Sequence, residues 1–370
     1  MKLNKFGWNE KWESAFQEYQ KKSTNETLEP ARLTAVFSDR YRIQTKKGER
    51  EAQVSGKMIF ETLYAAKNPT VGDWVAIEYN DCGPSVIKGV LPRASCLQRQ
   101  EADGIEAQVI GANVDLCILV QSVIGDYSIA RLDRYIAMVW DAGSTPMVVL
   151  TKTDLVSEEE VILKVKELEY AFPGVDVLAV SAVTNEGIDK LWPLLEPHKT
   201  YMVLGSSGVG KSTLLNILME EEIMKTAEVR EDDQKGRHTT THRQMFTLKN
   251  GALYIDTPGM REVGLFNYEG LDKAFSDVGK LAKNCKFADC KHRDEPQCAV
   301  QEAMETGRLS QDRWESYLKL KTEEKIHRRK QITLQKKAAK AKIKRQKSHY
   351  KDFKRGGVTE DKELRQWMQS

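Results

Sequence analysis

The sequence lacks any run of about 18 apolar residues, the length that a helix needs to cross a bilayer. Its first residues, MKLNKFGWNEKWESAF, also lack the apolar core of a secretory signal peptide. These two absences predict a cytoplasmic protein without a membrane partner. With 40% hydrophobic and 30% charged residues over 370 positions, the chain has room for two or three globular domains.

Cysteine is scarce, with six residues in the chain, and Cys82, Cys96 and Cys117 are scattered. We expect these three to be ordinary buried thiols. The others cluster with a histidine in CKFADCKHRDEPQC, which reads C-x4-C-x-H-x5-C. Disulfides do not suit a reducing compartment, whereas three thiolates and one imidazole match the tetrahedral preference of Zn²⁺. Free thiols by coincidence are the alternative. The predicted ligands of one structural zinc ion are Cys285, Cys290, His292 and Cys298.

The net charge of +3 hides an uneven distribution. Residues 321–355 contain 15 Lys or Arg against three acidic residues, a net charge of +12, so the rest of the chain carries −9. A cationic segment releases counterions when it meets phosphates, which favours a polyanionic partner, and a solvated charged helix is the alternative. This tail lacks enough large apolar residues to fold alone, so we expect it to be partly helical when bound.

The first hundred residues change pattern near residue 31. Before it, aromatic residues at helical spacing predict an amphipathic helix docked on the body rather than a binding element. After it come five short alternating runs: ARLTAVFSD, RYRIQTKKG, EREAQVSG, VGDWVAIEY and SVIKGVLP. Five such strands predict a small closed barrel of the OB-fold type. The barrel pattern alone leaves RNA binding open.

From about residue 109 the pattern becomes strand, helix, strand. The apolar runs VDLCILVQSV, TPMVVLTK, VDVLAVSA and KTYMVLGSS end in polar or glycine-rich turns, with helical stretches between them. This pattern predicts a mostly parallel, doubly wound sheet with ligands at the carboxyl ends of its strands. A hairpin that turns at Asn250 and Gly251 is expected to follow.

The stretch GSSGVGKS, residues 205–212, has the pattern of a phosphate-binding P-loop between a strand and a helix. Its backbone N–H groups can close around phosphates at a helix N-terminus. We expect Lys211 to reach the β and γ phosphates and Ser212 to ligate Mg²⁺. The predicted contacts of this loop with the nucleotide are Gly205, Ser206, Ser207, Gly208, Val209, Gly210, Lys211, Ser212 and Thr213.

The stretch DTPG, residues 256–259, follows an apolar strand about 45 residues after the P-loop. Here the carboxylate of Asp256 is expected to hold Mg²⁺, directly or through water, and the peptide of Gly259 to contact the γ-phosphate.

Two upstream motifs, TKTD and SA, predict the base. The carboxylate of Asp154 can accept hydrogen bonds from guanine N1–H and the exocyclic amine, while the stem of Lys152 covers the ring. A backbone N–H of the SA motif can meet guanine O6. A carboxylate repels adenine, whose matching edge presents an acceptor, so GTP is predicted over ATP. The predicted base contacts are Thr151, Lys152, Thr153, Asp154, Ser181 and Ala182.

The order of these motifs is unusual, because small GTPases begin with the P-loop and end with the base motifs. Rotating the order preserves the site if the old termini lie close together, and residues 185–200 would be the new connection. The motif order, TVGDWV, VLPRAS, GRHTT and the Cys/His cluster resemble the RsgA (YjeQ) family of circularly permuted, small-subunit-dependent GTPases. The resemblance covers about residues 31–315.

The resemblance implies an N-terminal OB-fold, a central GTPase and a C-terminal helical zinc domain. It implies action late in 30S assembly, with GTP hydrolysis that the subunit stimulates. The expected partners are the 30S subunit with its 16S rRNA and GTP or GDP, with other assembly factors as candidates, and we expect a monomer. The predicted divisions are 1–30 (helical extension), 31–100 (OB-fold), 101–268 (permuted GTPase), 269–320 (zinc domain) and 321–370 (basic extension).

Two residues depart from common GTPase chemistry. Thr151 stands where NKxD motifs have an asparagine that ties the base loop to the P-loop, so guanine affinity is expected to fall. Met260 stands where Ras-like enzymes have a water-orienting glutamine, which predicts slow intrinsic hydrolysis. His238 in GRHTT, together with Lys211, is the catalytic candidate, and an exposed loop histidine is the alternative. Either Thr239 or Thr240 is expected to ligate Mg²⁺.

The leading hypothesis is therefore a GTPase that assists late maturation of the 30S subunit. The alternative is an RNA-binding assembly factor that uses GTP as a structural ligand without significant hydrolysis. A GTPase that serves another RNA or a membrane is less favoured, because the barrel, the Cys/His cluster and the basic tail all favour RNA.

Overall fold

The computed structural model describes residues 2–23, 27–37, 40–56, 58, 68–100, 107–125, 127–219, 243–256, 268–293 and 295–354. The chain divides into two compact units, Met1–Tyr317 and Leu318–Ser370. Among the described residues, none of the helices has the length and hydropathy of a membrane span.

The first unit begins with a closed five-stranded barrel, as predicted. Its strands are β1 (Leu28–Val36), β2 (Tyr41–Thr45), β3 (Gly48–Val54), β4 (Trp74–Glu78) and β5 (Ser85–Val90). They pair in the order β1-β2-β3-β5-β4, and a further β1–β4 pairing closes the barrel. Only the β3–β5 pairing is parallel among these strands. This is an OB-like arrangement, and alternate residues such as Leu33, Ile43 and Ile77 fill its interior.

The N-terminal extension packs on this barrel, as its aromatic spacing predicts. It consists of the 3₁₀-helix η1 (Lys2–Phe6) and α1 (Glu10–Lys22), which starts where the Asn9 side chain accepts a hydrogen bond from the Trp12 N–H. Trp8, Trp12 and Phe16 lie in one buried cluster with Trp74 of β4. The extension therefore buries its apolar stripe against the barrel.

A two-stranded ribbon, which the sequence analysis did not predict, connects the barrel to the next sheet. It pairs β6 (Cys96–Gln100) with β7 (Ala107–Ala112) in antiparallel fashion. The polar composition of CLQRQ and a register shift between Leu97 and Gln98 obscure the alternation that would have indicated these strands.

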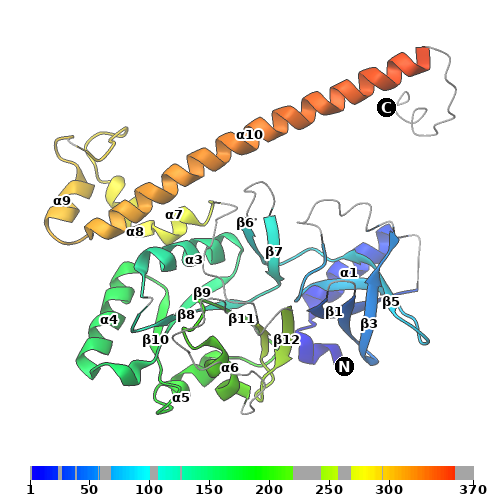
Figure 1. Ribbon diagram of the computed structural model, residues 1–370, viewed down its shortest axis with the longest axis horizontal. Coiled ribbons are helices and arrows are strands. Elements are labelled where there is room, and N and C mark those ends of the chain that lie inside the picture. Colours follow the sequence, from blue (N-terminus) through cyan, green and yellow to red (C-terminus); the bar gives the residue numbers. More distant parts are fainter. Residues whose placement is uncertain are drawn as a thin grey trace, which may run out of the picture. The chain divides into compact units, whose positions relative to one another are not determined.

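The central sheet is mostly parallel. β8 (Leu116–Ser122), β9 (Thr145–Thr151), β10 (Asp176–Ala179), β11 (Thr200–Leu204) and β13 (Leu253–Asp256) run parallel, and β12 (Arg243–Thr247) is antiparallel to β13. The order is β10-β9-β8-β11-β13-β12, and β12 also pairs with β1 of the barrel (Figure 1). The P-loop strand β11 thus lies in the middle of the sheet. Three strands of this sheet, β8, β9 and β10, precede it in the chain.

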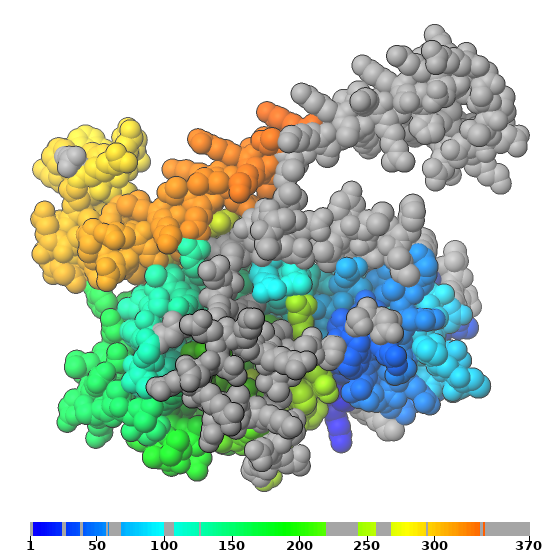
Figure 2. Space-filling view, viewed as in Figure 1, coloured from blue at the N-terminus to red at the C-terminus, as the bar shows by residue number. Residues whose placement is uncertain are grey.

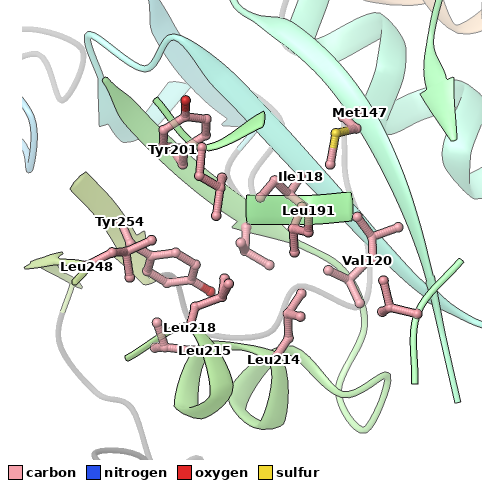
Figure 3. Packing of buried hydrophobic residues seen from close by; sticks show 14 of the residues in the cluster. Ile118, Val120, Met147, Leu191, Tyr201, Leu214, Leu215, Leu218, Leu248 and Tyr254 are labelled. Atoms are coloured by element: carbon pink, nitrogen blue, oxygen red, sulfur yellow. The ribbon is translucent and has the colours of Figure 1, made fainter. Parts of the chain in front are cut away.

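Helices follow the strands of this sheet. They are α3 (Ile129–Asp141), η3 (Thr153–Leu155), α4 (Glu158–Ala171), α5 (Ile188–Leu191), η4 (Trp192–Leu194) and α6 (Lys211–Met219). The last of these packs Leu214, Leu215 and Leu218 against Val120 and Ile118 of β8 in one buried cluster (Figure 3). This cluster fixes the helix that follows the P-loop.

The C-terminal part of the first unit is helical, as predicted. It contains α7 (Leu271–Ala274), α8 (Ser276–Ala282), α9 (Ala299–Glu305) and the start of α10 (Gln311–Lys354). These residues gather around the first turns of α10, in yellow and orange in Figure 2.

The described part of the basic segment is helical. The helix α10 continues to Lys354, and the rest of the tail that we expected to be partly helical, residues 355–370, lies outside the described residues. No glycine or proline occurs between residues 311 and 354, and Lys, Arg, Gln and Ala are strong helix formers. Local propensity therefore extends the helix where a packed core is not needed.

Candidate nucleotide and metal sites

The carboxyl ends of the parallel strands gather most of the predicted nucleotide contacts at one edge of the central sheet. The P-loop follows β11, Thr151 ends β9, Ser181 follows β10, and Asp256 ends β13. Gly205 opens the loop with φ +153°, and a Cβ there would lie 2.4 Å from the carbonyl oxygen of Val120. Only glycine allows the loop to leave the sheet so close to β8.

The side chain of Lys211 lies inside the loop. Its Nζ donates to the carbonyl oxygen of Gly205 at 2.9 Å and to that of Ser206. Burial lowers the pKa of Lys211 to about 8, although the carboxylate of Asp256 opposes this shift. The site is thus built to receive negative charge, which would restore the charged form of the lysine.

A second cation contacts the P-loop, and sequence reasoning missed it. Nη1 of Arg131, in the first turn of α3, donates to Oγ of Ser206 at 2.9 Å. The helix α3 follows β8, and β8 pairs with β11, so the strand order brings this arginine to the loop. The sequence pattern does not give that order, so it carried no signal for the contact.

The two base motifs are joined by a direct hydrogen bond. Oγ of Ser181 donates to Oδ1 of Asp154 at 2.6 Å, and this Oγ in turn accepts from the backbone N–H groups of Val183 and Thr184. Asp154 is exposed, whereas Ser181 is fully buried. The carboxylate is therefore held at one oxygen and presented to solvent, as a group that receives two donors of a base would be.

The hydroxyl of Thr151 connects the base side with the phosphate side. Its Oγ1 donates to the carbonyl oxygen of Val209 in the P-loop at 2.6 Å, with the carbonyl oxygen of Gln121 at 3.4 Å. Thr151 is 4% exposed, so this bond is shielded from water. The threonine thus ties the base loop to the P-loop. In NKxD motifs an asparagine makes this connection, and we expected threonine at this position to weaken it.

Some of the remaining predicted contacts lie in the described part of the chain and others lie outside it. Lys152 (φ +61°) and Thr153 lie in the turn before Asp154, and Ala182 follows Ser181. Asp256 is 7% exposed at the end of β13, and the negative charge of its carboxylate favours the charged form of Lys211. His238, Thr239, Thr240, Gly259 and Met260 lie outside the described residues, so their roles stay predictions.

The Cys/His cluster is brought together. The ligand atoms of Cys285, Cys290, His292 and Cys298 all lie within 4.8 Å of one another. Nδ1 of His292 lies 3.5 Å from Sγ of Cys285 and 3.4 Å from Sγ of Cys298, and the two sulfur atoms are 3.9 Å apart. Metal–sulfur bonds of about 2.3 Å at tetrahedral angles separate sulfur atoms by about 3.8 Å, so these residues fit a tetrahedral metal ion.

The surroundings act differently on two of the thiols. Burial disfavours a Cys285 thiolate, but hydrogen bonds from the backbone N–H groups of Ala299 and Val300, together with Cys298 and Cys290, lower the pKa of this thiol. Burial raises the pKa of Cys290 to about 11. The ring of Trp314 meets the ring of His292 edge to face, with the centroids 5.6 Å apart. The first turns of α10 thus contact the cluster.

The rotated strand order, the P-loop between β11 and α6, and the base motifs on the preceding strands define a circularly permuted P-loop GTPase. A family model described as "RsgA GTPase" matches residues 90–266. A "Small ribosomal subunit biogenesis GTPase RsgA 1" from Listeria monocytogenes is 45% identical over 81% of this chain and 84% of its own length. A similarly named protein from Methanosarcina acetivorans is 41% identical over 86% of this chain and 84% of its own length. The chain belongs to the RsgA GTPase family.

Two solved structures share the fold. The crystal structure of YjeQ from Thermotoga maritima has a TM-score of 0.60 and 30% identity, and it covers 80% of this chain and 98% of its own. The structure of YloQ, described as a circularly permuted GTPase, has a TM-score of 0.57 and 26% identity, with 80% and 95% covered. The permuted fold class predicted from the motif order is thereby confirmed.

Proposed function

We propose that this protein is a GTPase switch that assists late maturation of the small ribosomal subunit in the cytoplasm. The observation that carries the proposal is the hydrogen bond between Ser181 and Asp154 at the sheet edge that also holds the P-loop, because this edge then places guanine recognition beside phosphate binding. The relatives named for small-subunit biogenesis, which match over most of their length, support the choice of partner.

In this proposal the P-loop holds the phosphates and the two base motifs hold the guanine. Residues 205–213 supply backbone N–H groups, Lys211 supplies charge, and Asp154 accepts the two guanine donors. Lys152 covers the ring, and the backbone beside Ala182 meets O6. Thr151 and Thr153 shape the base loop.

Hydrolysis is assigned to residues near the γ-phosphate. Ser212, Asp256 and one of Thr239 and Thr240 would hold Mg²⁺, which neutralises phosphate charge when bound. Gly259 would contact the γ-phosphate. Met260 offers no group that can orient water, so His238 is the proposed water-positioning residue and basal hydrolysis is expected to be slow.

The metal centre is proposed to hold one structural zinc ion. Three thiolates and one imidazole complete four-coordinate Zn²⁺ and leave no position for substrate. Metal analysis of protein purified without chelators should give one zinc per chain, and Cys298→Ser should lose it. Cys82→Ser should not, because Cys82 is exposed and away from the cluster; the expectation that all three scattered thiols are buried was wrong, since only Cys117 among them is. Absence of zinc in the unmodified protein would refute this assignment.

The basic part of α10 is proposed to contact 16S rRNA. Clustered Lys and Arg side chains on one long helix release counterions from phosphates. Deletion of residues 321–370 should weaken binding to 30S subunits and reduce its dependence on salt. Equal binding and an equal salt slope would leave the helix as a solvated element without a role in RNA binding.

The decisive experiment measures phosphate release from GTP with and without purified 30S subunits. We expect slow release alone and a large increase with subunits, which His238→Ala should abolish without loss of GTP binding. No increase with subunits would favour the second candidate, an RNA-binding assembly factor that uses GTP as a structural ligand. Sedimentation of the free protein tests the expected monomer.

A further inference from the structure

The helix α3 carries two polar side chains that leave it on different faces. Arg131 and Asp133 are two residues apart, a rotation of about 200° around the helix axis. Arg131 contacts the P-loop, whereas Asp133 contacts the first turn of α10. One short helical segment therefore touches both the nucleotide site and the C-terminal helices of the first unit.

At the P-loop, two cations hold the same residue. Nη1 of Arg131 donates to Oγ of Ser206 at 2.9 Å, while Nζ of Lys211 donates to its carbonyl oxygen. Ser206 is 4% exposed, so both bonds form away from bulk water. Loss of the arginine would leave a buried hydroxyl and the adjoining peptide without this support.

On its other face, α3 is held by a buried ion cluster. Oδ1 of Asp133 accepts from Nη1 of Arg313, and Oδ2 accepts from Oγ of Ser316 at 2.6 Å. Arg313 also forms a two-point contact with Asp277 of α8, at 3.2 Å and 3.0 Å, and its guanidinium lies 4.2 Å from the ring centroid of Phe275. Asp133 and Arg313 are 0% and 3% exposed, so the cluster cannot exchange partners freely with water.

A hydrogen bond and a close backbone approach hold the end of α3 against the start of α7. The N–H of Gly270 donates to Oδ1 of Asp141 at 3.2 Å. A Cβ at position 270 would lie 2.2 Å from the carbonyl oxygen of Ala137, so the two backbones are in direct contact. The helix therefore cannot shift relative to α7 without breaking tight packing.

We propose that Arg131 is a positioning residue of the nucleotide site that acts through Ser206, and that the Asp133–Arg313 pair sets its position from the C-terminal helices. Coupling of this kind is reciprocal: nucleotide binding favours one position of α10's first turn, and a partner that moves this turn changes nucleotide affinity. The inference rests on nucleotide binding and on no part of the ribosomal role.

The first test compares Arg131→Gln, Arg131→Lys, Ser206→Ala and the double variant of Arg131→Gln with Ser206→Ala. We expect Arg131→Gln to weaken GTP and GDP binding about tenfold and to raise KM with little change in kcat, since a charged hydrogen bond is lost. Arg131→Lys should restore part of the affinity. The double variant should bind no worse than the weaker single variant. The proposal would be overturned if Arg131→Gln bound nucleotide as tightly as the wild type. It would also be overturned if the losses of affinity from Arg131→Gln and Ser206→Ala multiplied in the double variant.

The second test asks whether the ion cluster acts through Arg131. Arg313→Gln should weaken nucleotide binding in the wild-type background and add no further loss in the Arg131→Gln background. Arg308→Gln is the matched control, because this arginine forms an exposed pair with Glu302 and should leave affinity unchanged. If the losses of nucleotide affinity from Arg313→Gln and Arg131→Gln multiply in the double variant, the ion cluster does not act through Arg131.

Folding is checked by circular dichroism before binding is compared. Should Arg313→Gln not fold, Ser316→Ala removes a single hydrogen bond to Asp133 and should give a smaller change of the same direction. A wild-type protein that binds no GTP would refute the proposed function, whereas a wild-type protein that binds GTP with unaffected variants would refute this inference alone.

Discussion

The hydroxyl group of Ser181 donates a 2.6 Å hydrogen bond to the carboxylate of Asp154, so each of the two base motifs holds the other. The two residues are 27 positions apart and come from the ends of neighbouring parallel strands, β9 and β10. This bond leaves the second carboxylate oxygen unconstrained by Ser181 and orients the group that is predicted to select guanine.

Replacing Asp154 by asparagine should change base preference. An amide presents one acceptor and one donor, which mismatches the two donors of guanine but matches xanthine, whose C2 carries a carbonyl. We expect GTP affinity to fall by about tenfold or more and XTP affinity to exceed it, because hydrogen bonds to charged groups are strong. Equilibrium binding of both nucleotides measures this. Asp189→Asn, at an exposed position on α5, is the control, and an unchanged GTP preference in Asp154→Asn would contradict the base assignment.

Replacing Thr151 by valine should loosen the connection between the base loop and the P-loop. Valine keeps the shape but leaves the carbonyl oxygen of Val209 without its 2.6 Å donor. The expected loss of nucleotide affinity is about tenfold, the worth of one buried hydrogen bond. Thr151→Ser keeps the hydroxyl and should bind nearly as the wild type does. Equal affinity of the valine variant would mean that the bond does not support binding.

Nucleotide binding should take up protons at alkaline pH. The pKa of Lys211 is about 8 in the free protein because of burial, and phosphate oxygens beside it would raise that pKa. At pH 8.5 most of these lysines are neutral before binding, so binding should take up about three quarters of a proton, against about one tenth at pH 7. Calorimetry in buffers of different ionisation enthalpy measures the uptake. GTP affinity should accordingly fall as pH rises above about 8, and no uptake at pH 8.5 would contradict the charged role of Lys211.

The carboxyl group of Asp133 should make stability depend on pH. Burial raises its pKa to about 6, although Arg313 and Ser316 oppose the shift and Asp277 adds to it. A folded-state pKa above the unfolded value means that folding binds a proton, so this contribution is present at pH 4 and is lost as pH rises through 6. Asp133→Asn removes the titration. The difference in free energy of unfolding between wild type and variant should shift by about 2–3 kcal/mol in favour of the variant from pH 4 to pH 6.5. A constant difference over this range would show that Asp133 is not perturbed.

Local sequence patterns were sufficient for most of the architecture. Alternation predicted the five barrel strands, apolar runs predicted β8 to β11, and GSSGVGKS predicted the strand, loop and helix around Lys211. The ribbon of β6 and β7 escaped because its polar residues and bulge hide the alternation.

The site was predictable where its residues lie in short motifs. The gathering of Asp154, Ser181 and the P-loop was predictable because each motif follows a strand of one parallel sheet, and such strand ends meet at one edge. The gathering of Cys285, Cys290, His292 and Cys298 was predictable because all four fall within fourteen residues of sequence. The contacts of Arg131 and Arg313 were not predictable, since each joins segments that are far apart in the chain.

The sequence by itself determined which residues could carry the proposed chemistry: Lys211 for phosphate binding, Asp154 for guanine selection, and three cysteines with one histidine for a metal centre. Those properties depend on residue type and short spacing. Only the tertiary structure decided that Thr151 ties base to phosphate through Val209, and that Arg131 and Asp133 link the P-loop to α10. Such contacts depend on strand order and helix packing, which arise when the whole chain buries its apolar surface and which no local pattern contains.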